Sequence, residues 1–146
     1  MDKKITLEQA VRFHGHLGPW LVLGVLMGEH AVKTLKAKKY FGVEVKVWGA
    51  NKRPKSCLID GLQLSTGATY GKGNIAKYNG NKLKVNFSLS YSPRSITCGL
   101  TKEIQMILNK TKNHATNGQL ARRLYSRSPC SIFTVKIKEN KWRSPD

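Results

Sequence analysis

The stretch FHGHLGPWLVLGVLMG, residues 13–28, places a pair of histidines directly before a long apolar run. His14 and His16 are two residues apart, so they cannot lie on one helix face, where neighbours are three or four residues apart. Gly15 lies between them, and Gly18-Pro19 follows. These breakers predict a bend that carries both histidines.

Helices are expected on both sides of this bend. Thr6, followed by Glu8 and Gln9, is typical of a helix N-cap, and the helix after it would carry an apolar face of Leu7, Ala10, Val11 and Phe13. Pro19 suits the first turn of a second helix, which we expect to run to about Lys38 and to lie in the core. Both histidines would then lie close to the N-terminus of that second helix, where backbone N–H groups favour an anion or a thiolate.

A second distinctive stretch, SCLIDG at residues 56–61, follows about 40 residues later. Ser56 or Cys57 is expected to start a short helix that runs through Gln63. A thiol at a helix N-terminus usually has a lowered pKa, which we therefore predict for Cys57. A loop of small residues, Ser65–Asn74, follows and would be able to approach a ligand closely.

The rest of the chain predicts mostly antiparallel strands and further helices. Valines alternate with charged residues at 43, 45 and 47, which predicts a strand with one solvated face. The other expected elements are a hairpin of 75–78 and 82–90 around Asn79-Gly80-Asn81, a helix from Arg94 to about Lys112, a helix at 117–125, and a strand at 132–138. We expect an α+β fold, in which a mostly antiparallel sheet packs against a long N-terminal helix and additional helices. One domain, 1–138, would precede a polar tail, 139–146.

Composition limits the class of protein. The 146 residues carry 26 Lys and Arg against 8 Asp and Glu, a formal net charge of +18. Nucleic acid, an acidic protein and an anionic small molecule are all compatible partners. No apolar stretch is long enough to span a membrane. Three cysteines without CxxC spacing do not make a disulfide framework, so we expect a cytoplasmic, reduced protein. Cys98 and Cys130 are both expected to be buried.

His and Cys are suited to bind zinc or to act together as base and nucleophile, so the two stretches form a candidate site if the fold joins them. The alternative is that the histidines cap a helix or fill a core gap and that Cys57 is a small buried hydrophobic residue.

The segments FHGHLGPWLVLGVLMG and SCLIDGLQLSTGATYGKGNI together resemble the core domain of the formylmethanofuran dehydrogenase E-subunit family. The resemblance implies an α+β core, often homodimeric, with a metal-binding pocket. It assigns the metal to His14, His16 and Cys57, and makes pocket groups of Asp60, Gln63, Thr66, Thr69 and Lys72. Two features depart from the family pattern. Ala68 replaces the second cysteine of the later motif, and the paired CxxC motifs of a C-terminal zinc finger are missing.

Two functions follow as hypotheses. In the first, His14, His16 and Cys57 hold zinc or another divalent transition metal, and a fourth position stays open for water or substrate. Cys57 and Asp60 are then the candidate catalytic residues, while Gln63, Thr66, Thr69 and Lys72 bind a small anionic ligand, or the protein is an accessory in one-carbon metabolism. In the alternative, the core is retained without catalysis in a basic module that binds nucleic acid or an acidic partner. The sequence leaves open whether the protein is an enzyme.

Overall fold

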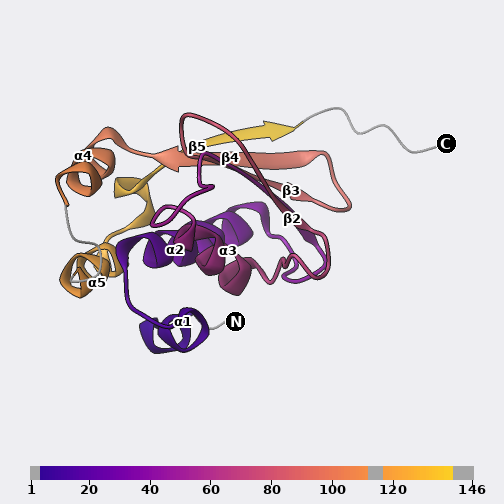
Figure 1. The fold of residues 1–146 in the computed structure, drawn as a ribbon. Coiled ribbons are helices and arrows are strands. Elements are labelled where there is room, and N and C mark those ends of the chain that lie inside the picture. Colours follow the sequence, from indigo (N-terminus) through magenta and orange to yellow (C-terminus); the bar gives the residue numbers. More distant parts are fainter. Residues whose placement is uncertain (1–3, 112–116, 140–146) are drawn as a thin grey trace.

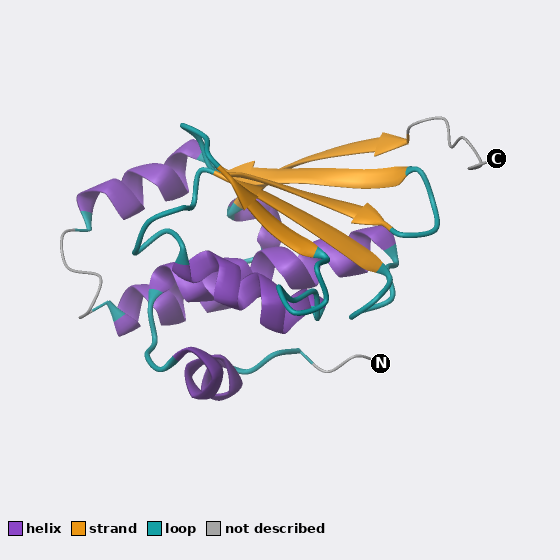
Figure 2. Cartoon of the chain, turned by 45° about the vertical axis from the view of Figure 1, so that its right-hand side comes forward, coloured by secondary structure: helices purple, strands orange, loops and turns teal. Residues whose placement is uncertain are grey.

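The computed structural model describes residues 4–111 and 117–139. A five-stranded sheet, in the order β2-β1-β3-β4-β5, forms one layer, and α2 and α3 lie beneath it (Figure 1). The α1 helix lies beyond them, on the side away from the sheet. The strands are β1 Val43–Trp48, β2 Ile75–Tyr78, β3 Lys84–Leu89, β4 Arg94–Leu100 and β5 Phe133–Glu139. The helices are α1 Leu7–His14, α2 Pro19–Leu35, α3 Cys57–Thr66, α4 Lys102–Lys110, α5 Gly118–Ser126 and the short 3-10 turn η2 Pro129–Ser131. The α+β class is confirmed (Figure 2).

The N-terminal half of the chain folds largely as its pattern predicts. The side chain of Thr6 accepts a hydrogen bond from the Gln9 backbone N–H, and the Gln9 side chain accepts one from the Thr6 backbone N–H. This reciprocal pair fixes the start of α1. Val43, Val45 and Val47 of β1 are each at most 1% exposed, which confirms the expected alternation.

The predicted hairpin is wrong. The β2 strand does not pair with β3, because β1 lies between them. Val45 faces Ile75 of β2 in a parallel pair and Phe87 of β3 in an antiparallel pair. A short strand followed by Asn-Gly matches a hairpin locally, but β1 pairs with all four residues of β2 on one edge and with all six of β3 on the other, and this long-range pairing sets the strand order.

The predicted helix from Arg94 to Lys112 is also wrong in its first half. Residues 94–100 form β4, paired on one side with β3 and on the other with β5, and only 102–110 are helical. Ile96, Cys98 and Leu100 point into the core at strand spacing, whereas Ile104 and Leu108 follow at helical spacing. The apolar positions at 96, 100, 104 and 108 fit both periods, and the two flanking strands determine the outcome. The predicted end of this helix at 112 and the tail from 140 onward lie outside the described residues.

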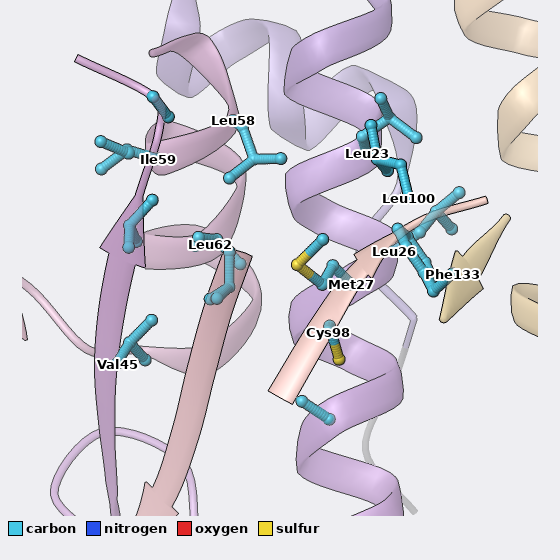
Figure 3. Packing of buried hydrophobic residues seen from close by; sticks show 14 of the residues in the cluster. Leu23, Leu26, Met27, Val45, Leu58, Ile59, Leu62, Cys98, Leu100 and Phe133 are labelled. Atoms are coloured by element: carbon cyan, nitrogen blue, oxygen red, sulfur yellow. The ribbon is translucent and has the colours of Figure 1, made fainter. Parts of the chain in front are cut away.

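The core lies between the sheet and the α2–α3 pair (Figure 3). Leu23, Leu26 and Met27 of α2 and Leu58 and Leu62 of α3 are all at most 4% exposed there. The two helices approach each other so closely at Gly24 of α2 that an added Cβ there would collide with the Leu58 carbonyl oxygen. The absence of a side chain at Gly24 therefore permits this contact. This close contact fixes the position of α3, whose first turn carries the candidate site.

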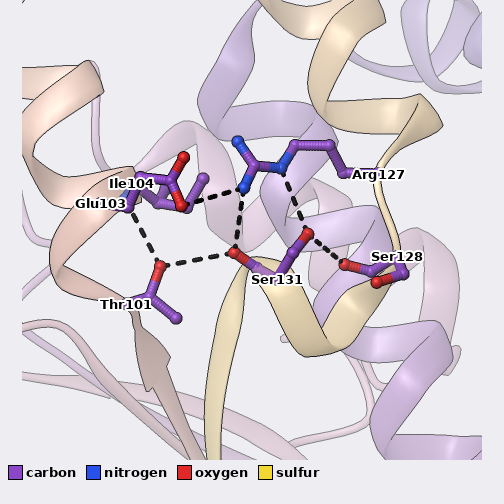
Figure 4. Close-up of polar contacts among 6 residues, drawn as sticks. All are labelled: Thr101, Glu103, Ile104, Arg127, Ser128 and Ser131. Atoms are coloured by element: carbon purple, nitrogen blue, oxygen red, sulfur yellow. Dashed lines mark hydrogen bonds and ion pairs between the residues drawn. The ribbon is translucent and has the colours of Figure 1, made fainter.

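A polar cluster ties the start of α4 to the chain after α5 (Figure 4). The Thr101 Oγ1 accepts from the Ile104 backbone N–H at 3.4 Å. Arg127 pairs with Glu103 at 3.2 Å and donates to Ser131 Oγ at 3.2 Å. The adjacent Cys130 is exposed, so its predicted burial is wrong, while that of Cys98 is confirmed.

Candidate metal centre

The bend between the two histidines is built by glycine. His14 is the last residue of α1, and Gly15 follows as its C-cap in the left-handed conformation, with φ of 109°. The Gly15 N–H donates to the Val11 carbonyl at 2.7 Å, which closes the helix. This positive φ favours glycine because a Cβ is strained there. The chain therefore reverses directly after His14 and carries His16 back toward it.

The structure joins the two distant stretches through one short hydrogen bond. Nδ1 of His14 lies 2.6 Å from Oδ2 of Asp60, which lies in the first turn of α3. The His14 side chain is 11% exposed and that of Asp60 is 39% exposed. A carboxylate on Nδ1 fixes the orientation of an imidazole and favours the proton on that nitrogen.

The other ring nitrogen of His14 has no partner. Nε2 is buried, and no hydrogen-bonding group in the described part of the chain reaches it. A buried ring nitrogen normally has a hydrogen-bond partner or a metal. With the proton on Nδ1, Nε2 presents a lone pair, which is the form in which a histidine binds a metal.

His16 and Cys57 lie beside this ring. The centroids of the His14 and His16 rings are 4.8 Å apart. His16 and Cys57 line one small pocket, together with Pro54 and Trp20. The chemistry of these donors, two imidazoles and one thiol, suits zinc. In the arrangement described for residues 4–111 and 117–139, however, no three His, Cys, Asp or Glu side chains are grouped closely enough to hold a metal ion.

The prediction of a lowered pKa for Cys57 is wrong. Burial raises the pKa of this thiol, the nearby Asp60 carboxylate raises it further, and Arg53 partly opposes both. Cys57 is the first residue of α3, but the loss of hydration and the adjacent negative charge outweigh the helix N-terminus.

The remaining predicted ligand-binding residues lie toward the C-terminal end of α3 and in the loop that follows. The Gln63 side chain accepts from the Tyr70 backbone N–H at 3.1 Å. The hydroxyl of Thr66 donates to the Leu62 carbonyl at 2.6 Å. Ten residues of helix span about 15 Å, so this end is well separated from Cys57.

The loop itself uses the other two side chains. Lys72 Nζ donates to the Gly67 carbonyl at 2.5 Å and lies 3.3 Å from the Thr69 hydroxyl. The same ammonium lies 5.3 Å from the ring centroid of Phe41. The structure thus gives Lys72 and Thr69 roles within the loop, and ligand binding by these residues stays a prediction.

A larger cavity, which Trp20 also lines, was not predicted. Four lysines from three separate segments of the chain line it, Lys55, Lys82 with Lys84, and Lys136. Composition indicated the positive charge, but nothing in the local sequence shows that these four positions converge.

This fold and site define the class: an α+β protein with a histidine–aspartate pair beside a cysteine. Residues 13–136 match the family described as FmdE, Molybdenum formylmethanofuran dehydrogenase operon, and the chain belongs to this family. The resemblance carried by the two histidine and cysteine motifs is thereby confirmed.

The fold is similar to that of a tungsten formylmethanofuran dehydrogenase FmdE-like protein from Syntrophus aciditrophicus. The TM-score is 0.67 at 21% sequence identity, over 92% of this chain and 71% of that chain. A comparison with curated proteins found no match. Within the described residues, no helix is both long and apolar enough to cross a membrane.

Proposed function

We propose that this FmdE-family chain is a metal-binding protein in which His14, His16 and Cys57 hold zinc or another divalent transition metal. The observation that carries the proposal is the His14 ring. Its Nδ1 is 2.6 Å from the Asp60 carboxylate, and its Nε2 is buried without a partner among the described residues. A histidine anchored by a carboxylate on one nitrogen and free on the other has the usual arrangement of a metal ligand and its supporting group.

Each residue has a distinct role in this proposal. Asp60 orients the His14 ring and holds the proton on Nδ1. His16 and Cys57, which line the same small pocket, complete the donor set after a rearrangement of their side chains. A bound divalent metal supplies Lewis acidity at this place. The raised pKa of the Cys57 thiol means that a proton must leave it when the metal binds.

The proposed biological role is to bind a small anionic ligand next to the metal, as an accessory in one-carbon metabolism. The family description, which refers to a formylmethanofuran dehydrogenase operon, supports that context. The net charge of +18 supports an anionic ligand.

The test is the metal content and metal affinity of the purified chain. The unmodified protein should bind one equivalent of Zn²⁺, and His14→Ala, His16→Ala and Cys57→Ala should each lose it. Asp60→Asn should retain the site but bind Zn²⁺ about 10–100-fold more weakly, because its loss frees the His14 ring. Gln63→Ala is a matched control on the same helix and should bind Zn²⁺ normally.

Two outcomes would contradict this function. The first is an unmodified chain that binds no Zn²⁺, Co²⁺ or Ni²⁺ above the level of Cys57→Ala. The second is equal metal content in all of these variants. Circular dichroism of each variant distinguishes loss of ligands from loss of the fold.

A further inference from the structure

We propose that the cavity lined by Lys55, Lys82, Lys84 and Lys136 is a binding site for a small polyanion that carries several phosphate or carboxylate groups. We call it the lysine cavity. The inference deepens the ligand-binding part of the proposed function and rests on that part, but it needs no metal.

The first argument is the unneutralised charge. Lys55 precedes α3, Lys82 precedes β3 and Lys84 begins it, and Lys136 lies on β5, so the fold brings together three segments that are distant in sequence. Among the described residues, no Asp or Glu lines the cavity, and none of these lysines forms an ion pair. The Lys84 ammonium lies 4.6 Å from the ring centroid of Trp48, which does not line the cavity. Like charges around one concavity repel one another, and a bound anion relieves that repulsion.

The second argument is hydrogen-bond chemistry. Ammonium groups are donors only, so the four lysines that line the cavity suit an acceptor-rich ligand. Trp20, which is 6% exposed, also lines the cavity. Its indole Nε1 is itself covered and has no hydrogen-bond partner within the described part of the chain, so the indole serves here as part of the wall.

The third argument is size and shape. The cavity holds about 550 Å³, within the range of roughly 300–1,000 Å³ that is typical of small-molecule sites. Its remaining wall includes the polar residues Thr97, Thr134 and Gln105, which can both donate and accept. A cavity of this size fits a small molecule better than a nucleic-acid backbone, which follows an extended groove.

The position connects the cavity to the proposed metal centre. Trp20 lines both the lysine cavity and the small pocket of His16 and Cys57. The two proposed sites therefore share the Trp20 side chain as a wall residue.

The experiment is a calorimetric titration of the full chain, freed of metal by a chelator and dialysis, with inorganic pyrophosphate and, separately, with citrate. Both probes bind metal ions, so a metal-free sample is required. We expect one of them to bind with one-to-one stoichiometry, and the tighter probe tells phosphate from carboxylate ligands. Lys82→Gln/Lys84→Gln should weaken that binding by about tenfold or more. Lys38→Gln/Lys77→Gln is the matched control, because it removes the same charge from two lysines outside the cavity and should change the affinity less than about twofold.

A second readout reports on the cavity itself. In the ¹H–¹⁵N spectrum, the indole signal of Trp20, assigned with Trp20→Phe, should shift on saturation with the probe more than the other two indole signals. No binding of either probe would overturn the inference. It would also be overturned by equal loss in the two double variants, or by a Trp20 signal that does not move, since both indicate only non-specific attraction to a basic surface. If short single-stranded DNA binds and neither probe does, the surface is a nucleic-acid site instead.

The two proposals fail separately. Anion binding by a chain that binds no metal would remove the metal centre and leave the lysine cavity. Normal Zn²⁺ binding without anion binding would do the reverse.

Discussion

The close contact between α2 and α3 predicts that Gly24→Ala destabilises the protein, although Gly→Ala inside a helix usually stabilises. In a helix interior, Gly→Ala stabilises by about 1 kcal/mol, because alanine has the higher helix propensity. Gly24 lies inside α2, but an added Cβ there would collide with the Leu58 carbonyl oxygen and lie 3.0 Å from the Gly61 Cα. Backbone atoms cannot rotate away, so α3 must move.

The expected magnitude follows from these two opposing effects. Overpacking of a core costs about 1–3 kcal/mol, and a backbone collision calls for the upper end of that range. Subtracting the propensity gain of about 1 kcal/mol leaves Gly24→Ala less stable by about 2 kcal/mol. For a chain of this size the midpoint of thermal unfolding should fall by about 4–8 °C. Because α3 carries Asp60 and Cys57, Zn²⁺ affinity should fall as well.

Urea unfolding followed by circular dichroism measures this effect. Gly118→Ala is the control, because the nearest atom to its added Cβ is 3.7 Å away and it lies in the first turn of α5. That variant should be as stable as the unmodified chain or slightly more so. If Gly24→Ala matched Gly118→Ala in stability, the close contact of α2 with α3 would not exist as described.

Three further predictions concern one partly buried carboxyl group and two buried side chains. Burial raises the pKa of Glu29 above its ordinary value of 4.5, so the folded chain keeps a proton that the unfolded chain loses, and stability is lost as pH rises through that interval. Glu29→Gln should therefore gain stability relative to the unmodified chain as pH rises above 4.5, and a pH-independent difference in melting temperature would contradict this. Thr66→Val keeps the shape but removes the acceptor for the Ala68 N–H, which is 3.1 Å away, so it should cost about 1–3 kcal/mol in urea unfolding and leave Zn²⁺ binding unchanged. Reduced Zn²⁺ binding by a folded Thr66→Val would show that this residue acts at the site. Phe87 is fully buried on β3, so Phe87→Ala should lower the free energy of unfolding by about 3–5 kcal/mol. A decrease below about 1 kcal/mol in urea unfolding would mean that this side chain does not lie in the core.

Local signals predicted much of the framework. The capping residues Thr6 and Gln9 indicated the start of α1, and Pro19 indicated the start of α2, because both act within one helical turn. The motif around Cys57 correctly predicted α3. Where a segment was compatible with two structures, as at Ile96 and Leu100, the local pattern predicted helix and the structure has a strand.

The candidate site was likewise predicted only in part from the sequence. The types of residue that bind metal, and the two motifs that contain them, were evident from the order of the chain. The role of Asp60 was open between a base and an orienting group, and the 2.6 Å contact with His14 places it against that ring. Gln63 and Thr66 lie toward the far end of α3, and the structure separates them from Cys57 at its start.

By itself, the sequence determined the α+β class, the FmdE family, the bend at His14 and His16, and an excess of positive charge. Only the tertiary structure decided that β1 separates β2 from β3, that His14 meets Asp60, and that lysines from three distant segments line one cavity with Trp20. The physical reason is range. Caps, turns and periodicity act over a few residues, whereas strand order, burial and the convergence of charges depend on contacts between segments that are far apart in the chain.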